Sequence, residues 1–125
     1  MSKLVLGDTY SRAEISKMFG GSVIDYLPEV NGEVVCVCIT DKDNQDTRTT
    51  TPKILVGKGP RIISTAKMFL KQTKAIPMFL KQKTNEWQYM GDFKVTSEIS
   101  DPALVLSIGV VSGRTDVTSV LNLEH

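Results

Sequence analysis

The fold is decided by the stretch Ile76-Pro-Met-Phe-Leu-Lys-Gln-Lys-Thr-Asn-Glu-Trp-Gln-Tyr-Met-Gly-Asp-Phe-Lys-Val95. Apolar and polar residues alternate on both sides of a polar break at residues 83–85, which predicts two strands joined by a turn. Gly91 interrupts the second strand where a bulge or a close backbone approach is expected. One parity of that strand carries its large apolar side chains, Trp87, Tyr89, Phe93 and Val95. Four of the eight aromatic residues lie on this ribbon, so both the core and a site are expected here.

The whole chain of 125 residues is long enough to bury one core, and its formal net charge is +1. It contains no apolar run of the roughly 20 residues that a membrane span needs and no charged-then-apolar signal at Met1. We therefore expect a cytoplasmic protein without a membrane partner. The ending Leu-Glu-His resembles the start of a purification tag, so residues 1–123 are expected to form one domain and residues 124–125 to be a tag remnant.

The sequence offers little for catalysis or for metal binding. Cys36 and Cys38, the only cysteines, lie two apart on a predicted strand, where they share a face and cannot easily form a disulfide. We interpret them as two buried thiols. The one histidine is His125, and no nucleophile motif is present. We therefore expect no catalytic residue, no metal site and no cofactor, and a protein that is not an enzyme.

Other segments give the remaining elements. Ser11 and Glu14 fit a capping box that starts a helix, which Gly20-Gly21 ends. The run 34–39 is typical of a central strand buried on both faces, and the polar stretch 41–52 is typical of a long exposed loop.

Residues 54–56 predict a short strand, and a second helix begins at Pro60. The buried stripe of that helix is expected to contain Ile62, Ile63, Ala66, Phe69 and Leu70. Residues 103–111 fit a helix or a strand equally well, and 117–123 fit a closing strand. About six strands and two helices, without regular alternation, indicate an α+β domain with a mostly antiparallel sheet that could close as a barrel.

The segments 76–81 and 87–95 resemble a pattern of SRA (YDG) domains and other PUA-like barrels: an apolar strand ending in a basic residue, then tyrosine, one residue, glycine, an aromatic and valine. Tyr89 and Gly91 match the tyrosine and glycine of the signature, whereas Met90 replaces its aspartate and Asp92 lies one position beyond. Upstream segments, Phe19–Ser22, Tyr26–Pro28, Val34–Cys36 and Ile54–Pro60, are similar to an uncharacterised bacterial domain found N-terminal in HNH-endonuclease-like proteins. The resemblance implies a pseudobarrel that senses a modified base in DNA or RNA beside a nuclease partner.

The charge pattern supports a polyanionic partner. Between positions 53 and 94 nine cations face two acids, a local net charge of +7. Within that window the turn Gly57-Lys-Gly-Pro-Arg61 leads into a helix N-terminus, where unpaired backbone N–H groups could seat a phosphate. The alternative is that the glycines only make the turn and the cations are solvated.

We predict a non-catalytic nucleic-acid-binding module that senses a modified base. In this hypothesis Tyr89 stacks on the base, Asp92 recognises its polar edge, and Lys58 and Arg61 contact an anion with the backbone at Gly59. The other candidate ligand-binding residues are Tyr26, Trp87 and Lys94. Two alternatives stay open, a protein-interaction or regulatory module of a defence system and a small-molecule sensor with its pocket under Trp87. The nucleic acid, the modification and the oligomeric state are also left open.

Overall fold

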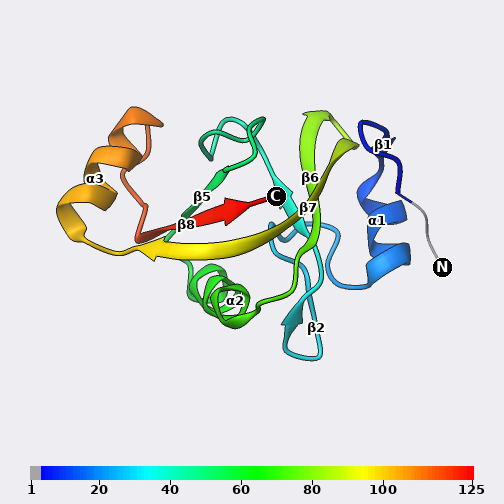
Figure 1. Ribbon diagram of the computed structural model, residues 1–125, viewed down its shortest axis with the longest axis horizontal. Coiled ribbons are helices and arrows are strands. Elements are labelled where there is room, and N and C mark those ends of the chain that lie inside the picture. Colours follow the sequence, from blue (N-terminus) through cyan, green and yellow to red (C-terminus); the bar gives the residue numbers. More distant parts are fainter. Residues whose placement is uncertain (1–3) are drawn as a thin grey trace.

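The computed structural model describes residues 4–125, and the expectations that concern residues 1–3 lie outside this range. Within it the chain forms eight strands and three helices; six of the strands make one curved sheet and the other two a separate hairpin (Figure 1). In order these are β1 (Thr9–Tyr10), α1 (Arg12–Phe19), β2 (Glu29–Val30), β3 (Glu33–Val34), β4 (Val37–Ile39), β5 (Lys53–Val56), α2 (Pro60–Lys71), β6 (Ile76–Lys83), β7 (Glu86–Ile99), α3 (Pro102–Val111) and β8 (Ser119–Glu124).

The predicted ribbon is the centre of the sheet. Strand order is β4-β6-β7-β8-β5, with β1 also paired to β7, and only the β4–β6 pair is parallel. Strand β7 is 14 residues long and pairs with β6 along its first half and with β8 along its second (Figure 1). The α+β, mostly antiparallel fold class is confirmed. There are three helices instead of two, because residues 102–111, left open by the sequence, form α3.

The expected bulge at Gly91 is present, and it changes which residues share a face. Met78 pairs with Gly91 and Phe79 with Tyr89, so Met90 is the extra residue, and Gly91 has a φ of +112°. An extra residue inverts the alternation of side chains beyond it. The predicted shared face for Trp87, Tyr89, Phe93 and Val95 is therefore wrong: the first two lie on one face of the ribbon and the last two on the other.

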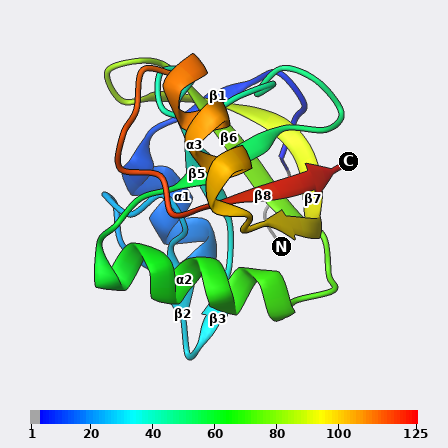
Figure 2. The same ribbon diagram turned by 90° about the vertical axis from the view of Figure 1, so that its left-hand side faces the viewer.

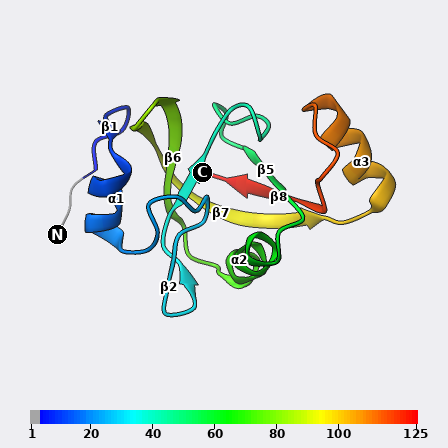
Figure 3. The same ribbon diagram turned by 180° about the vertical axis from the view of Figure 1, so that it is seen from behind.

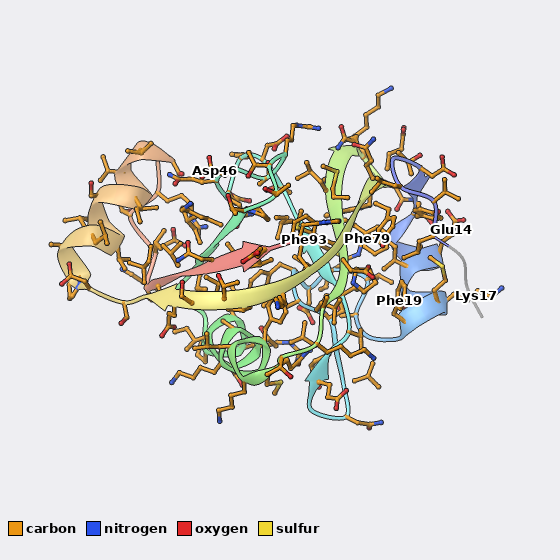
Figure 4. All side chains as sticks on the ribbon, in the orientation of Figure 1. Glu14, Lys17, Phe19, Asp46, Phe79 and Phe93 are labelled. Carbon is orange, nitrogen blue, oxygen red and sulfur yellow. The ribbon has the colours of Figure 1, made fainter. Side chains whose placement is uncertain are left out.

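Two hydrophobic clusters cover the two faces of β6. One contains Met78, Leu80 and Phe93 with side chains from α2, β5 and β8, and the other contains Phe79 and Trp87 with side chains from α1. Figure 4 labels Phe79 of one cluster, toward α1, and Phe93 of the other, toward β8. The alternation predicted for 76–81 is confirmed, because it places Met78 and Leu80 opposite Phe79.

The apolar run 34–39 is not the predicted central strand. It is split between β3 and β4, and β4 lies at the end of the strand order. Its burial has another cause, since the 26–28 segment covers the outer edge of β4: Cys38 N donates to Tyr26 O at 2.7 Å and Val35 N to Pro28 O at 2.9 Å. A strand covered on its edge by irregular chain shows the same sequence pattern as a strand between two neighbours.

The helices follow their local signals. Ser11 and Glu14 form the predicted capping box of α1, and α2 begins at Pro60 after an N-cap, Gly59, that lacks a side chain to cap it. Helix α2 packs against the sheet beside the β2–β3 hairpin, as Figure 2 shows. Ile62 does not join its buried stripe, since 39% of its surface is exposed. No helix within residues 4–125 is long and apolar enough to cross a membrane.

Candidate functional site

A cavity of about 1170 Å³ opens among segments that are far apart in the sequence. Its wall is formed by the start of α1, residues 23–26, the end of β4, the β6–β7 turn and the connection from α3 to β8. Figure 3 shows the courses of α1, β6, β7 and α3 in the backbone. Aromatic, cationic, carboxylate and amide side chains line it together, including Tyr26, Trp87, Arg12, Lys81, Arg114, Asp25, Asp43, Asp116, Asn44 and Asn85. A large cavity with a few convergent polar groups is the usual form of a ligand site.

Tyr26 stands in the middle of this wall. Its hydroxyl donates to Ile62 O at 2.7 Å, and its main-chain carbonyl accepts from Cys38 N. Burial raises the pKa of Tyr26 to about 12, and the hydrogen bond to Ile62 O holds the ring in one orientation. A fixed aromatic face beside an open cavity is suited to stacking against a planar ligand.

Trp87 forms a second aromatic wall, and two cationic side chains lie over its ring. The guanidinium carbon of Arg12 lies 5.0 Å from the ring centroid of Trp87, and Lys81 Nζ lies 5.8 Å from it. Lys81 and Trp87 are cross-strand partners, which places their side chains on one face of the ribbon. Only 7% of Trp87 is exposed, so this ring borders the cavity while its body belongs to the second hydrophobic cluster.

The other end of the cavity is a fixed ion pair. Arg114 binds Asp116 through Nε at 2.9 Å and Nη2 at 2.8 Å, and its Nη1 donates to the carbonyls of Asp43 and Leu55. This pairing lowers the pKa of Asp116 and raises that of Arg114. Gly57 allows the pair to lie close, because a Cβ there would be 3.0 Å from Asp116 Oδ2.

The rim of the cavity carries an exposed apolar turn. Ile24 is 83% exposed and Val23 49% exposed, and both line the cavity. The turn is held from both sides: Ser22 Oγ accepts from the backbone N–H of Ile24, and Arg12 Nη2 donates to the carbonyls of Ser22 and Asp25. Water-exposed apolar side chains on a fixed turn beside a cavity indicate a surface that a partner covers.

Of the sequence-predicted aromatic residues, the structure brings Tyr26 and Trp87 into the cavity wall and leaves Tyr89 out of it. The ring of Tyr89 packs 5.7 Å from Phe79, and its hydroxyl donates to Asp92 Oδ1 at 2.7 Å. The bulge makes this contact because it turns Asp92 to the face of Tyr89, and not to the face of Met90 as a regular strand would. The roles of Tyr89 and Asp92 as ligand-binding residues stay predictions.

The predicted basic residues are spread over the surface. Arg61 pairs with Asp25 of the cavity wall at 2.9 Å, while Lys58 and Gly59 lie on the turn that follows the cavity residue Gly57. Lys94 lies on β7 opposite Glu124, away from the cavity lining. Lys67 and Lys71 border a separate groove of about 430 Å³ beside α2. A phosphate seat at the 57–61 turn stays a prediction.

Sequence reasoning missed every polar cavity residue except Tyr26 and Trp87, and the two arginines, Arg12 and Arg114, are the most informative of those missed. Arg12 follows a helix N-cap and Arg114 follows a glycine in a turn, and both positions read as ordinary surface positions. Only the fold shows that Arg12 is 8% exposed and stacked near Trp87. The two predicted buried thiols are present as free Cys36 and Cys38, and no group that could hold a metal occurs within residues 4–125.

The sequence matches no protein-family model and no curated protein sequence. Its fold, in contrast, matches solved structures. The chain superposes on KRYPTONITE in complex with mCHG DNA and SAH with a TM-score of 0.69 and 14% identity, covering 98% of this chain and 32% of that one. It also superposes on the SUVH5 SRA domain in a complex with hemi-methylated CG DNA, with a TM-score of 0.67, 9% identity and coverage of 100% and 90%.

A third match is a structure of the sulfur-binding and SRA domains of ScoMcrA complexed with phosphorothioated DNA, with a TM-score of 0.55, 15% identity and coverage of 98% of this chain and 40% of that one. This chain therefore spans about a third of the KRYPTONITE chain but most of the SUVH5 domain. The fold is SRA-like, as the resemblance implied. The link to HNH-endonuclease-like proteins stays a prediction.

Proposed function

We propose that this chain is a non-catalytic DNA-binding module that senses a modified base by accepting it, extruded from the duplex, in the cavity between Tyr26 and Trp87. The observation that carries the proposal is the cavity itself, because it combines fixed aromatic walls with convergent polar groups. The structures with the same fold are complexes with modified DNA, which supports the choice of ligand.

The chemistry of the cavity lining suits an extruded base. Proteins that read or modify one base of a duplex take it out of the stack and hold it by aromatic contact and polar groups. Tyr26 offers the stacking face, and Asn44, Asp43 and Asp25 lie around it in the same wall. Stacking of a base on an aromatic side chain is worth about 1–3 kcal/mol, which is enough to separate a good ligand from a poor one.

The exposed rim fits a duplex whose stack has been opened. Proteins that distort DNA often place apolar side chains against unstacked base steps. Ile24 and Val23 are such side chains, and they stand at the mouth through which a base would enter. Lys81 in the cavity wall and Lys58 close to Asp116 supply positive charge for the DNA backbone, while the charge of Arg61 is paired with Asp25.

The direct test compares duplexes of one sequence that carry an unmodified base or one of a panel of modified bases, with affinity measured by fluorescence anisotropy over a series of salt concentrations. We expect tighter binding to at least one modified duplex and a linear fall of log affinity with log salt. Tyr26→Leu, which removes the ring but keeps an apolar side chain, should weaken that binding on the order of tenfold or more.

Tyr89→Leu is the matched control, because it removes an equally large ring outside the cavity. It should leave the preference for the modified duplex intact. Loss of binding in Tyr89→Leu with normal binding in Tyr26→Leu would instead place the site on Tyr89 and Asp92. Thermal unfolding of both variants must show that each is folded.

The same experiment separates the two alternatives. A small-molecule sensor would bind the free modified nucleoside as tightly as the duplex, with little dependence on salt. A protein-interaction module would bind none of the duplexes and would fail the test outright. RNA and a nuclease partner stay predictions without support from the known structures of this fold. Single-stranded RNA carrying the same base serves as a further competitor.

A further inference from the structure

The cavity end formed by Arg12, Trp87 and Lys81 has positive charge without a matching acid. Arg12 is 8% exposed, and a buried guanidinium usually pairs with a carboxylate. Within residues 4–125 neither Arg12 nor Lys81 forms a salt bridge. Of the three carboxylates in the cavity wall, Asp25 binds Arg61, Asp116 binds Arg114, and Asp43 accepts a hydrogen bond from Thr40 Oγ1.

The three nitrogens of the Arg12 guanidinium have different environments. Nη2 donates to the carbonyls of Ser22 at 3.0 Å and Asp25 at 2.8 Å. Nε is buried and has no hydrogen-bond partner in the described part of the chain. Nη1 also donates to no acceptor there, but it is not sealed from solvent as Nε is, and Arg12 lines the cavity. Because Nε is sealed, Nη1 is the free donor of this guanidinium that a ligand in the cavity would meet.

A second cation and a turn complete the site. Lys81 Nζ stands over the same Trp87 ring at 5.8 Å, and Thr84 and Asn85 of the β6–β7 turn line the same end. Asn85 Oδ1 accepts from the backbone N–H of Arg12 at 3.1 Å, which fixes the turn to the start of α1. The result is a guanidinium and an ammonium on one aromatic ring, both open to one space.

We propose that Arg12 and Lys81 form a phosphate-binding site at the Trp87 end of the cavity, which holds the backbone phosphate of the extruded nucleotide. The identity of this phosphate rests on the proposed function, whereas the anion site itself does not. Charge-assisted hydrogen bonds to phosphate are strongest where the donors are already fixed and partly desolvated, as Arg12 is. The base would then lie between Tyr26 and Trp87, and its phosphate at the Trp87 end of the same cavity.

Trp87 is the only tryptophan, so its fluorescence reports on this site directly. Titration with inorganic phosphate, against sodium chloride of equal ionic strength, should give a saturable change in Trp87 emission. Lys81→Gln should weaken the apparent affinity for phosphate on the order of tenfold. Lys17→Gln should not, because Lys17 is an exposed lysine on the outer side of α1 that lines neither cavity (Figure 4).

Arg12→Gln should abolish the phosphate response and Arg12→Lys should restore part of it. If Arg12→Gln does not fold, the titration of Lys81→Gln still tests the phosphate site, because Lys81 is exposed. No saturable response beyond that of chloride, or an unchanged response in Lys81→Gln, would overturn the site.

A second measurement connects the site to the nucleotide. The 5′- or 3′-monophosphate of the preferred modified nucleoside should bind on the order of tenfold more tightly than the nucleoside, and Lys81→Gln should remove this advantage. A phosphate response without preference for any modified duplex would refute the proposed function and keep the anion site. A modified-base preference without a phosphate response would refute the anion site and keep the function.

Discussion

Removal of one hydroxyl, by Tyr26→Phe, tests whether the wall of the cavity is as rigid as the structure shows. The Tyr26 hydroxyl donates to Ile62 O at 2.7 Å. That carbonyl also accepts from Thr65 Oγ1 at 3.1 Å, so it keeps a partner when the hydroxyl is removed. The loss at neutral pH should therefore equal one ordinary hydrogen bond, about 1 kcal/mol of unfolding free energy.

The pH dependence of this difference has a defined sign. Burial raises the pKa of Tyr26 from 10.0 to about 12 in the folded protein. The stabilising effect of the hydroxyl is fully present below pH 10, and it is lost as pH rises toward 12 because the unfolded tyrosine ionises first. Two pKa units correspond to roughly 2.7 kcal/mol at most.

The wild type should therefore be the more stable protein at pH 8, and Tyr26→Phe the more stable one above about pH 10.6. Urea denaturation at pH 8, 9, 10, 10.5 and 11, followed by circular dichroism, measures both proteins under the same conditions. Lysines titrate in this range too, but their effect cancels in the difference between the two proteins. A stability difference that stays constant from pH 8 to pH 11 would show that the hydroxyl is not buried against Ile62.

Two further predictions concern Gly21 and Gln72, neither of which lines the cavity, and both are tested by chemical denaturation. Gly21→Ala should lower the unfolding free energy by roughly 2–3 kcal/mol, because a Cβ there would lie 2.8 Å from Pro28 Cβ at a φ of +82°. Gly32→Ala is the control, since Gly32 has the same φ but open space around it, and it should lower the unfolding free energy by only about 1–2 kcal/mol. Equal losses in the two variants would refute the steric argument. Gln72→Ala should lower the unfolding free energy by about 2–4 kcal/mol, because two hydrogen bonds to buried Val34 are lost. The Gln72 side chain accepts from the backbone N–H of Val34 at 2.7 Å and donates to the Val34 carbonyl at 3.0 Å. A loss below about 0.5 kcal/mol would show that water replaces both bonds.

Much of the fold could be predicted from local patterns, because the features that set it are local. The capping box at Ser11, the proline at the start of α2 and the bulge at Gly91 each depend on a few neighbouring residues. Burial of the run 34–39 was also predictable, but its place in the sheet was not. Residues 26–28 cover this edge as a neighbouring strand would, so the run is buried in either arrangement.

The cavity could not be predicted because its residues share no spacing. Arg12, Tyr26, Trp87 and Arg114 come from four separate segments and meet only through the fold. Sequence reasoning favoured Tyr89 as the ligand-binding ring because it stands next to a glycine, but a glycine in a strand can serve the backbone alone. Here it serves the bulge, and the space it leaves lies beside Phe93 and His125, away from the cavity.

The bulge explains how one strand can serve both the core and a binding site. Before Gly91, β7 presents Trp87 to α1 and the cavity; after it, the same strand presents Phe93 to α2 and β8. Without the extra residue these rings would share a face, and one side of the ribbon would lack the ring it needs. Trp87 can thus contact a ligand in the cavity while Phe93, which is 2% exposed, remains buried in the larger cluster. A change of the exposed Lys81 should therefore alter binding more than it alters the stability of the sheet.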